Sequence, residues 1–256
     1  MPEISIADDL ALALDPVLFA RRVGIDPDDK QQELLTTASR RTLVLCTRQW
    51  GKSTTAAILA GHEAIYSPGS LTVLVSPSQQ QSTELLRKVH GFWKQLPNAP
   101  AADQENLTRL TLENGSRIIS LPGSERTTRG YSAASLVVMD EASRVDDALL
   151  AAVRPMQATV EHGRFIALTT PAGKRGWFYK AWMDGVGWHR ITVRADACPR
   201  ISKEFLAEEL ASLGPLRFAA EYDCEFIDDA ASAFNTALIE AALSLDFPPF
   251  FVEAAA

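Results

Sequence analysis

The sequence predicts an α/β fold in which a mainly parallel sheet lies between helices. Short apolar runs that read as buried strands alternate along the chain with segments whose apolar residues have helical spacing. This alternation is typical of a parallel sheet that helices cover on both faces. A Gly-Lys-Ser triplet also follows the first strand and opens a helix, which is where a phosphate-binding loop is found.

The composition fits one or two globular domains and excludes several other classes of protein. The chain has 256 residues, of which 46% are hydrophobic and 22% charged, close to the globular average. No apolar run approaches the roughly 20 residues that span a bilayer, so no membrane segment is expected. Cys46, Cys198 and Cys224 are too scattered for a disulfide framework or a CxxC metal site, and they fit a reducing compartment. The net charge of −7 does not indicate a surface dominated by nucleic-acid contacts.

The elements of the amino-terminal half follow from apolar spacing and from the signals that start and stop helices. Residues 7–22 have helical spacing and end in two arginines, which favour a helix C-terminus. A shorter helix is expected over 29–38. The run TLVLC at 42–46 is typical of a buried strand. The same criteria predict a helix over 51–66, a buried strand over 71–76 and a helix over 79–95.

Residues 107–121 have a different pattern, which predicts an antiparallel hairpin attached to the main sheet. LTRLTL and RIISL alternate in polarity, and Glu113-Asn114-Gly115-Ser116 separates them. An Asn-Gly pair between alternating runs is a strong hairpin signal. Beyond the hairpin, we expect buried strands over 135–139, 164–169 and 189–193, and helices over 147–158, 176–184, 202–213 and 215–224.

The phosphate-binding loop (P-loop) pattern G-x-x-x-x-G-K-[ST] matches residues 46–53, except that Cys46 replaces the first glycine. Lys52 would reach the β and γ phosphates of a nucleotide, and the Ser53 hydroxyl would ligate Mg²⁺. A chance triplet at a helix start is the alternative, and the strand–loop–helix context favours the P-loop. Trp50 could instead be a packed hydrophobe, and Arg48 a solvated surface residue. The residues expected at the nucleotide are Thr47, Arg48, Gln49, Trp50, Gly51, Lys52, Ser53 and Thr54.

An acidic pair, Asp140 and Glu141, follows the apolar run 136–139. A buried strand that ends there places both carboxylates at the carboxyl edge of the sheet, where α/β proteins bind ligands. Asp140 is expected to hold Mg²⁺ through water. Glu141 is expected to accept a proton from the water that attacks the γ phosphate. The alternative explanation for the acidic pair is the first turn of a helix, whose dipole favours acidic residues. The P-loop upstream favours a catalytic role for the pair over this alternative.

Two further features could act on the γ phosphate. Thr169 and Thr170 end the fourth buried strand. In an additional-strand P-loop sheet this strand lies between the first and third strands. Both threonines would then lie beside the γ phosphate and could report its loss. An ordinary polar strand end is the alternative. Arg129 precedes the acidic strand in a Thr-rich segment, and a mobile guanidinium could meet the charge that develops during phosphoryl transfer. Arg126 competes for this role, and either arginine could simply be a surface residue.

Five segments in fixed order resemble the ATPase domain of the large terminase subunit of tailed bacteriophages. They are TRQWGKST, the hairpin, TTRGYSAASLVVMDEAS, LTTPAGKRGWFYKAW and EYDCEFIDDAASAF, and the resemblance runs from about Pro27 to Phe234. An R-Q-x-G-K-S loop that lacks the first glycine is typical of that family. The resemblance implies a P-loop NTPase fold of the additional-strand, RecA-like kind.

The resemblance also implies roles for individual residues. Arg48 matches the P-loop arginine that helps to bind and sense ATP. Gln31 matches an upstream glutamine that recognises adenine, although Lys30 replaces the usual aromatic neighbour. Arg129 matches the arginine finger that reaches the ATP of the neighbouring subunit. Thr169 and Thr170 match the motif that couples hydrolysis to DNA movement.

The function that the resemblance implies is Mg²⁺-dependent ATP hydrolysis that drives double-stranded DNA into a procapsid. The partners would be DNA, further copies of the chain in a ring that is expected to be a pentamer on a portal, and a small terminase subunit. No membrane partner is expected, and the location would be the cytoplasm of an infected bacterium. The alternatives are a helicase-like P-loop translocase and a non-hydrolysing nucleotide-binding scaffold.

The expected organisation has three parts. A helical segment, 1–40, packs on a P-loop ATPase domain, 41–234, and residues 235–256 form a tail or the start of a linker. Full large terminases continue into a nuclease with clustered aspartates, and no such cluster follows Phe234. We therefore expect no nuclease activity in this chain. It would be either a stand-alone ATPase or a truncated form of a longer protein, and we favour truncation.

Overall fold

The structure is a computed structural model, and it describes residues 5–122 and 130–227. The described residues form an eight-stranded sheet with the order β3-β4-β5-β2-β6-β7-β1-β8. The strands are β1 (Arg41–Cys46), β2 (Leu71–Ser76), β3 (Ala102–Glu105), β4 (Arg109–Leu112), β5 (Arg117–Pro122), β6 (Leu136–Asp140), β7 (Arg164–Thr169) and β8 (His189–Val193).

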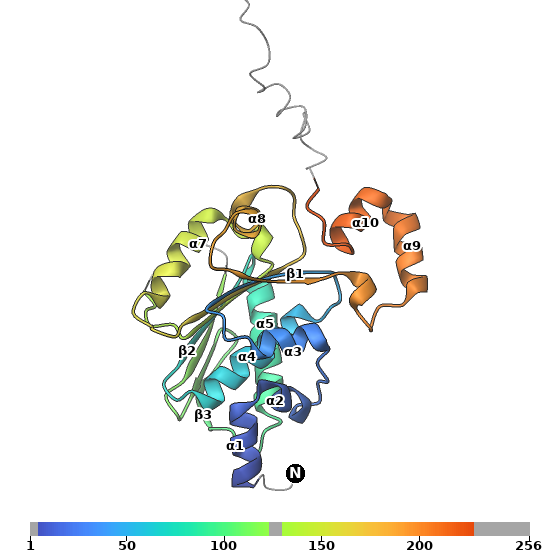
Figure 1. The fold of residues 1–256 in the computed structure, drawn as a ribbon. Helices are drawn as coiled ribbons and strands as arrows, with labels where there is room; N and C mark the ends of the chain where they lie inside the picture. Colours follow the sequence, from blue (N-terminus) through green and yellow to red (C-terminus); the bar gives the residue numbers. More distant parts are fainter. Residues whose placement is uncertain (1–4, 123–129, 228–256) are drawn as a thin grey trace, which may run out of the picture.

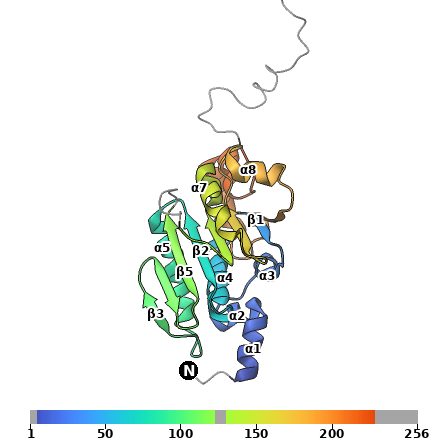
Figure 2. The same ribbon diagram turned by 90° about the vertical axis from the view of Figure 1, so that its left-hand side faces the viewer.

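The sheet is parallel except at one edge. β1 pairs in parallel with β7 and β8, β2 with β5 and β6, and β6 with β7. β3, β4 and β5 pair antiparallel at the edge, with β4 between the other two. Figure 2 shows β3 at this edge, with β5 and β2 further into the sheet. β7 lies between β6 and β1, so the predicted position of the fourth buried strand, between the first and third, is confirmed.

The predicted hairpin is present as β4 and β5. Gly115 adopts a positive φ of 83° in its turn, and the Asn114 side chain donates hydrogen bonds to the carbonyls of Ala64 and Ile65 at the end of α4. The turn is therefore fastened to the helix that follows the P-loop. The third antiparallel strand, β3, was not predicted. Its sequence ADQE is largely exposed and has no apolar alternation, so it carries no strand signal.

Helices cover both faces of the sheet, as predicted (Figure 1). One core cluster joins α2, α3, α4 and α5 to side chains such as Val44 and Leu74, and a second joins α7 and α8 to side chains such as Leu43 and Val73. Successive residues of β1 and β2 thus enter opposite cores, which explains their continuous apolar runs. The helices are α1 (Ile6–Leu14), α2 (Pro16–Arg22), α3 (Asp29–Thr36), α4 (Lys52–Tyr66), α5 (Gln79–Trp93), α7 (Asp147–Val153), α8 (Gly176–Met183), α9 (Lys203–Leu213) and α10 (Pro215–Glu221).

The prediction of one helix over 7–22 was wrong, because α1 and α2 are separate. Asp15 is extended, with φ −132° and ψ 103°, since the residue before a proline avoids the helical region. Its carboxylate accepts a hydrogen bond of 2.7 Å from the Val17 N–H and caps α2. The predicted helix over 147–158 is likewise α7 followed by a 3₁₀ turn, η2 (Arg154–Gln157).

The carboxyl-terminal helices α9 and α10 lie beside each other at one side of the molecule (Figure 1). The segment after α10 returns to the sheet, because the Tyr222 carbonyl accepts a hydrogen bond from the Ala195 N–H and the Cys224 thiol donates to the Val193 carbonyl. Cys46, Cys198 and Cys224 are all buried and free. Within the described residues, no helix combines the length and apolar character needed to cross a membrane.

Candidate active site

The P-loop, residues 47–51, joins the end of β1 to the start of α4. Gln49 and Gly51 both have positive φ, 62° and 97°. At Gly51 a Cβ atom would lie 2.9 Å from the Gln31 side-chain nitrogen, so both the conformation and the space require glycine here. The loop leads directly into the N-terminus of α4, and the N–H groups and dipole of a helix N-terminus favour an anion.

Ser53 and Asp140 lie together although 87 positions separate them in sequence. The Ser53 hydroxyl donates a hydrogen bond of 2.8 Å to the Asp140 carboxylate. Asp140 ends β6, is 6% exposed and also accepts a hydrogen bond of 3.0 Å from the Glu141 N–H. Burial raises the pKa of Asp140, and the nearby charge of Lys52 offsets this only in part.

Lys52 and Glu141 form the second link between the P-loop and the end of β6. The Lys52 ammonium lies 2.8 Å from the Glu141 carboxylate, and both side chains are less than one-fifth exposed. Glu141 adopts a left-handed conformation, with φ 54°, which turns it out of the strand direction. Burial alone would lower the pKa of Lys52, but the carboxylates of Asp140 and Glu141 outweigh burial and raise it. The two carboxylates therefore stabilise Lys52 in its charged form.

Thr169 and Thr170 are buried at the end of β7, between the two strands that carry the P-loop and the acidic pair. The Thr169 hydroxyl accepts a hydrogen bond of 3.2 Å from the Ser143 N–H and donates one of 2.8 Å to the Thr170 carbonyl. The Cys46 thiol donates to the Thr169 carbonyl at 3.6 Å. The end of β7 thus contacts Cys46 at the end of β1 and Ser143 in the turn that follows β6.

Arg48 contacts α10 in this structure. Its guanidinium Nε lies 2.6 Å from the Glu221 carboxylate, and its backbone N–H donates a hydrogen bond to the Glu221 carbonyl. Thr47 donates its hydroxyl hydrogen to the same carbonyl at 3.2 Å. Glu221, which sequence reasoning did not select, therefore holds the start of the P-loop.

The Trp50 side chain is fully buried, so Trp50 offers only its backbone to a ligand in the loop. Its indole N–H donates to Asp28 at 3.1 Å. Its carbonyl accepts hydrogen bonds from the Gln31 amide, at 3.1 Å, and from Arg200. Arg200 also forms an ion pair of 2.8 Å with Asp28. These side chains support the loop from outside.

Three comparisons with known proteins identify the family and the fold of this chain. The model of the family described as "Terminase large subunit, T4likevirus-type, N-terminal" matches residues 43–241. The chain belongs to the terminase large-subunit family. A terminase large subunit of Thermus phage G20c is 23% identical over 256 residues, an alignment that covers 85% of this chain and 52% of that relative. The chain therefore spans about half the length of the curated relatives it matches.

Solved terminase structures share the fold. The large terminase ATPase domain of Thermus phage P74-26 matches with a TM-score of 0.69 at 22% identity, covering 82% of this chain and 97% of that one. The large terminase of a thermophilic bacteriophage, solved in complex with ADP, matches with a TM-score of 0.64 at 11% identity, covering 78% and 53%. The predicted fold class, a mainly parallel RecA-like sheet with an antiparallel edge, is confirmed.

The structure of this terminase chain brings most of the predicted site residues together. Gln31 lies against the P-loop, but both ends of its amide are engaged: the oxygen accepts from the Asp28 N–H, and the nitrogen donates to the Trp50 carbonyl. Adenine recognition by Gln31 stays a prediction. The two finger candidates, Arg126 and Arg129, lie outside the described residues, as does the predicted tail.

The oxygen atoms of this terminase site fit a magnesium ion. The Ser53 hydroxyl and the Asp140 carboxylate are hard ligands that lie within hydrogen-bond distance of each other. Mg²⁺ is usually held by one or two such protein groups together with water and substrate phosphates. Across residues 5–122 and 130–227 no cluster of three His, Cys, Asp or Glu side chains could hold a metal ion by itself.

Proposed function

We propose that this chain hydrolyses ATP with Mg²⁺ and that hydrolysis drives double-stranded DNA into a procapsid. The observation that carries the proposal is the double link between the P-loop and the end of β6, Ser53 with Asp140 and Lys52 with Glu141. These contacts bring together a cation suited to bind phosphate, two oxygen groups suited to hold a metal ion and a carboxylate suited to act as a base. Membership of the terminase family supports the same conclusion.

In this proposal the P-loop binds the phosphates. Lys52 and Arg48 supply the charges, while Thr47, Gln49, Trp50, Gly51 and Thr54 contribute through the loop and the first turn of α4. Ser53 and Asp140 would hold Mg²⁺, which supplies charge neutralisation at the β and γ phosphates. Gln31 would recognise adenine after giving up its bond to the Trp50 carbonyl.

Glu141 is the proposed general base, and its ion pair suggests how it is controlled. While Lys52 is bound to Glu141, the carboxylate is not available to take a proton from water. A γ phosphate would draw the Lys52 ammonium toward itself, because it offers more negative charge than one carboxylate. The freed Glu141 can then accept the proton of the attacking water.

Thr169 and Thr170 would couple hydrolysis to movement. Their strand end touches Ser143, which follows the acidic pair, and Cys46, which precedes the P-loop. A change in phosphate occupancy on either side can therefore shift β7. Arg129 would act as the finger that stabilises the transition state in a neighbouring subunit.

The proposal includes the setting in which the chain works. The ATPase would form a ring on a portal, with a small terminase subunit and double-stranded DNA as partners, in the cytoplasm of an infected bacterium. We expect the isolated chain to bind DNA weakly at physiological salt, because its net charge is −7.

The deciding experiment is steady-state ATP hydrolysis by Glu141→Gln. Removal of the base should lower kcat by about 10²–10⁴-fold while ATP still binds, since a positioned base contributes on that order. Glu161→Gln, an exposed position with the same change of charge, is the matched control. Normal hydrolysis by Glu141→Gln would refute the assigned base. ATP binding without hydrolysis by the unmodified chain would favour the scaffold alternative.

A further inference from the structure

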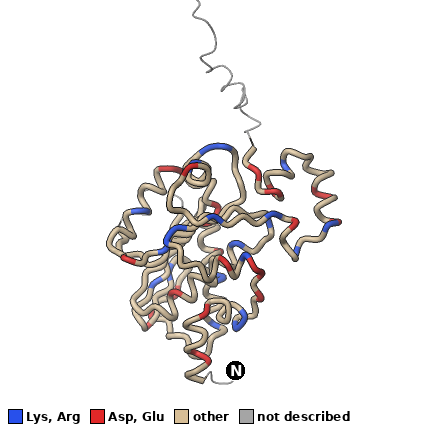
Figure 3. Tube along the Cα trace, in the orientation of Figure 1, with Lys and Arg blue, Asp and Glu red and all other residues tan. Residues whose placement is uncertain are grey.

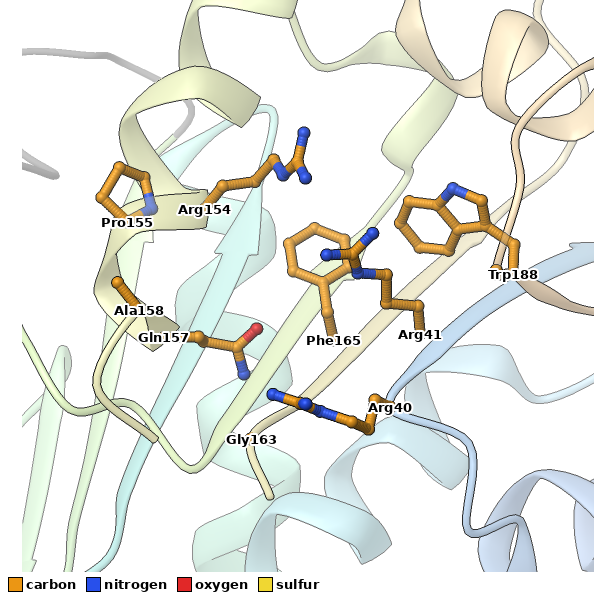
Figure 4. A pocket seen from close by; sticks show the side chains of 10 residues that line it. Arg40, Arg41, Arg154, Pro155, Gln157, Ala158, Gly163, Phe165 and Trp188 are labelled. Carbon is orange, nitrogen blue, oxygen red and sulfur yellow. The ribbon is translucent and has the colours of Figure 1, made fainter. Parts of the chain in front are cut away.

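A pocket of about 600 Å³ lies at the amino ends of the parallel strands, whereas the P-loop lies at their carboxyl ends. It opens at the amino ends of β1 and β7, whose other ends carry Cys46 and Thr169. A strand of six residues spans about 20 Å, so the pocket is separate from the nucleotide site. Ten residues line it: Arg40, Arg41, Arg154, Pro155, Gln157, Ala158, Gly163, Phe165, Gly187 and Trp188. Figure 4 labels all of them except Gly187.

Three arginines and no carboxylate line this arginine pocket. Arg41 begins β1 and Arg40 directly precedes it, whereas Arg154 comes from η2, on the far side of β7. Among the described residues none of the three forms an ion pair. Arg40 donates one long hydrogen bond, 3.4 Å, to the Val160 carbonyl, and Arg41 lies over the Trp188 ring. Most of their N–H donors therefore remain available.

The charge of the arginine pocket contrasts with that of the chain as a whole. Acidic residues outnumber basic ones, 32 to 25, and the two signs are interspersed along the trace in Figure 3. Near the P-loop, for comparison, Arg48 and Arg200 have carboxylate partners in Glu221 and Asp28. Three like charges around one cavity repel each other, so the arrangement favours an anionic ligand.

The walls of the arginine pocket hold its shape. Phe165 is buried and meets the Trp188 ring edge-on, with centroids 5.8 Å apart. The Arg41 guanidinium lies 6.0 Å from the Trp188 centroid, a cation–π contact that limits where it can point. The Gln157 amide donates to the carbonyls of Ala134 and Arg164. Gln157 therefore belongs to the frame, and the guanidinium groups are the parts free to bind.

We propose that the arginine pocket is a second phosphate-binding site of this chain. Guanidinium groups match phosphate oxygens in geometry and can bind them through two parallel hydrogen bonds. The phosphates can come from the backbone of duplex DNA or from a free polyphosphate, and both sources use the same chemistry. The inference does not depend on ATP hydrolysis, because it rests on a separate cavity.

The test uses the full chain with Lys52→Ala, which weakens anion binding at the P-loop. Binding is measured for a duplex of roughly 30 base pairs, by fluorescence anisotropy between about 50 and 200 mM salt, and for inorganic pyrophosphate, by calorimetry. The pocket variant is Arg40→Gln, Arg41→Gln and Arg154→Gln together. The control is Arg22→Gln, Arg117→Gln and Arg217→Gln, which are exposed positions outside the pocket with the same change of charge.

We expect the pocket variant to weaken at least one probe by about tenfold or more relative to the control. If DNA is the source, the slope of log K against log salt should also fall by about two to three, one for each lost phosphate contact. A loss confined to pyrophosphate identifies a small polyphosphate as the ligand. Equal weakening by pocket and control variants, or no binding of either probe, would overturn the proposal.

Two further readouts separate this result from folding and from the proposed function. The three single variants, each checked by thermal unfolding, replace the triple variant if it fails to fold. With Lys52 intact, the pocket variant should hydrolyse ATP at the normal rate in the absence of DNA. A chain that shows no ATPase activity but binds phosphate through these arginines would refute the proposed function and leave the pocket proposal standing.

Discussion

The Arg48 side chain has two alternative partners, Glu221 in this structure and the ATP phosphates in the proposed function. Its ion pair with Glu221 directs the guanidinium toward α10, whereas the proposed role requires it at the phosphates. The two contacts use the same donors, so they compete. Binding of ATP should therefore be opposed by Glu221 in proportion to the strength of the pair.

Glu221→Gln tests this competition. The pair is exposed, with side-chain exposures of 55% and 25%, and such pairs contribute about 0.2–1 kcal/mol. KM for ATP should therefore fall by about 1.5–5-fold, with kcat little changed, in steady-state assays. The exposed Glu225→Gln is the matched control. An unchanged or higher KM in Glu221→Gln would show that the pair does not compete with ATP.

Sequence reasoning found the residues of the site that lie within motifs and missed those that support it from a distance. Lys52, Ser53, Asp140 and Glu141 were predicted, and the structure brings them together, because a parallel sheet aligns the carboxyl ends of its strands. The supporting residues Asp28, Arg200 and Glu221 reach the loop from segments up to 174 positions away. No local pattern marks such long-range partners.

At the scale of elements, the P-loop depends on one glycine. Gly51→Ala forces a Cβ into a left-handed conformation and to within 2.9 Å of the Gln31 amide. We expect a loss of about 1–2 kcal/mol of unfolding free energy, measured by urea unfolding, together with weaker ATP binding. Gly91→Ala in α5 is the control: nothing lies within 4 Å of its Cβ, and it should stabilise the helix by about 0.5–1 kcal/mol. Equal effects at both positions would contradict this account.

The contact between α1 and α4 should respond to pH. His62, in α4, forms a hydrogen bond of 3.1 Å with the Leu12 carbonyl, and its ring meets Phe19 edge-on. Burial lowers the pKa of His62 below 6.5, and the bond to Leu12 offsets this only in part. The native state thus binds this proton less readily than the unfolded state, so stability should decrease as the pH falls through 6.5.

Urea unfolding at about pH 7.5 and about pH 5 measures this effect. His62→Gln should reduce the difference in unfolding free energy between the two pH values. It should not abolish the difference, because burial also lowers the pKa of His90. A variant with the same pH dependence as the unmodified chain would show that His62 does not contribute.

The elements that sequence reasoning missed have two different physical causes. β3 is a polar edge strand whose partner supplies the pairing, so tertiary contact and not its own pattern makes it a strand. The break at Asp15 is a local effect of Pro16 that helical spacing concealed. The strands β1, β2, β6 and β7 were located to within one residue because both faces of each are covered. β8 was located equally well, but it is an edge strand with Arg190 and Thr192 exposed, so the prediction that it is buried holds for one face only.

At the scale of the whole molecule, the proposed motor needs more than one copy. Arg129→Ala and Glu141→Gln should each be inactive alone. When the two are mixed under assembling conditions, subunits that retain Glu141 would receive Arg129 from a neighbour, so ATPase activity should return. Arg126→Ala, mixed in the same way, tests the competing arginine. A mixture of Arg129→Ala and Glu141→Gln that regains no activity would count against action between subunits.

The three buried thiols make this chain suitable for site-specific labelling. Cys46, Cys198 and Cys224 are each no more than 6% exposed, and burial raises the pKa of Cys46 and takes that of Cys224 to about 12. Thiolates are the species that react with maleimides, so the native thiols should stay unmodified in the folded protein. One cysteine placed on α9 and one on α7 would then carry a fluorophore pair without removal of any native cysteine, and the pair would test whether α9 and α10 move relative to α7 when nucleotide binds.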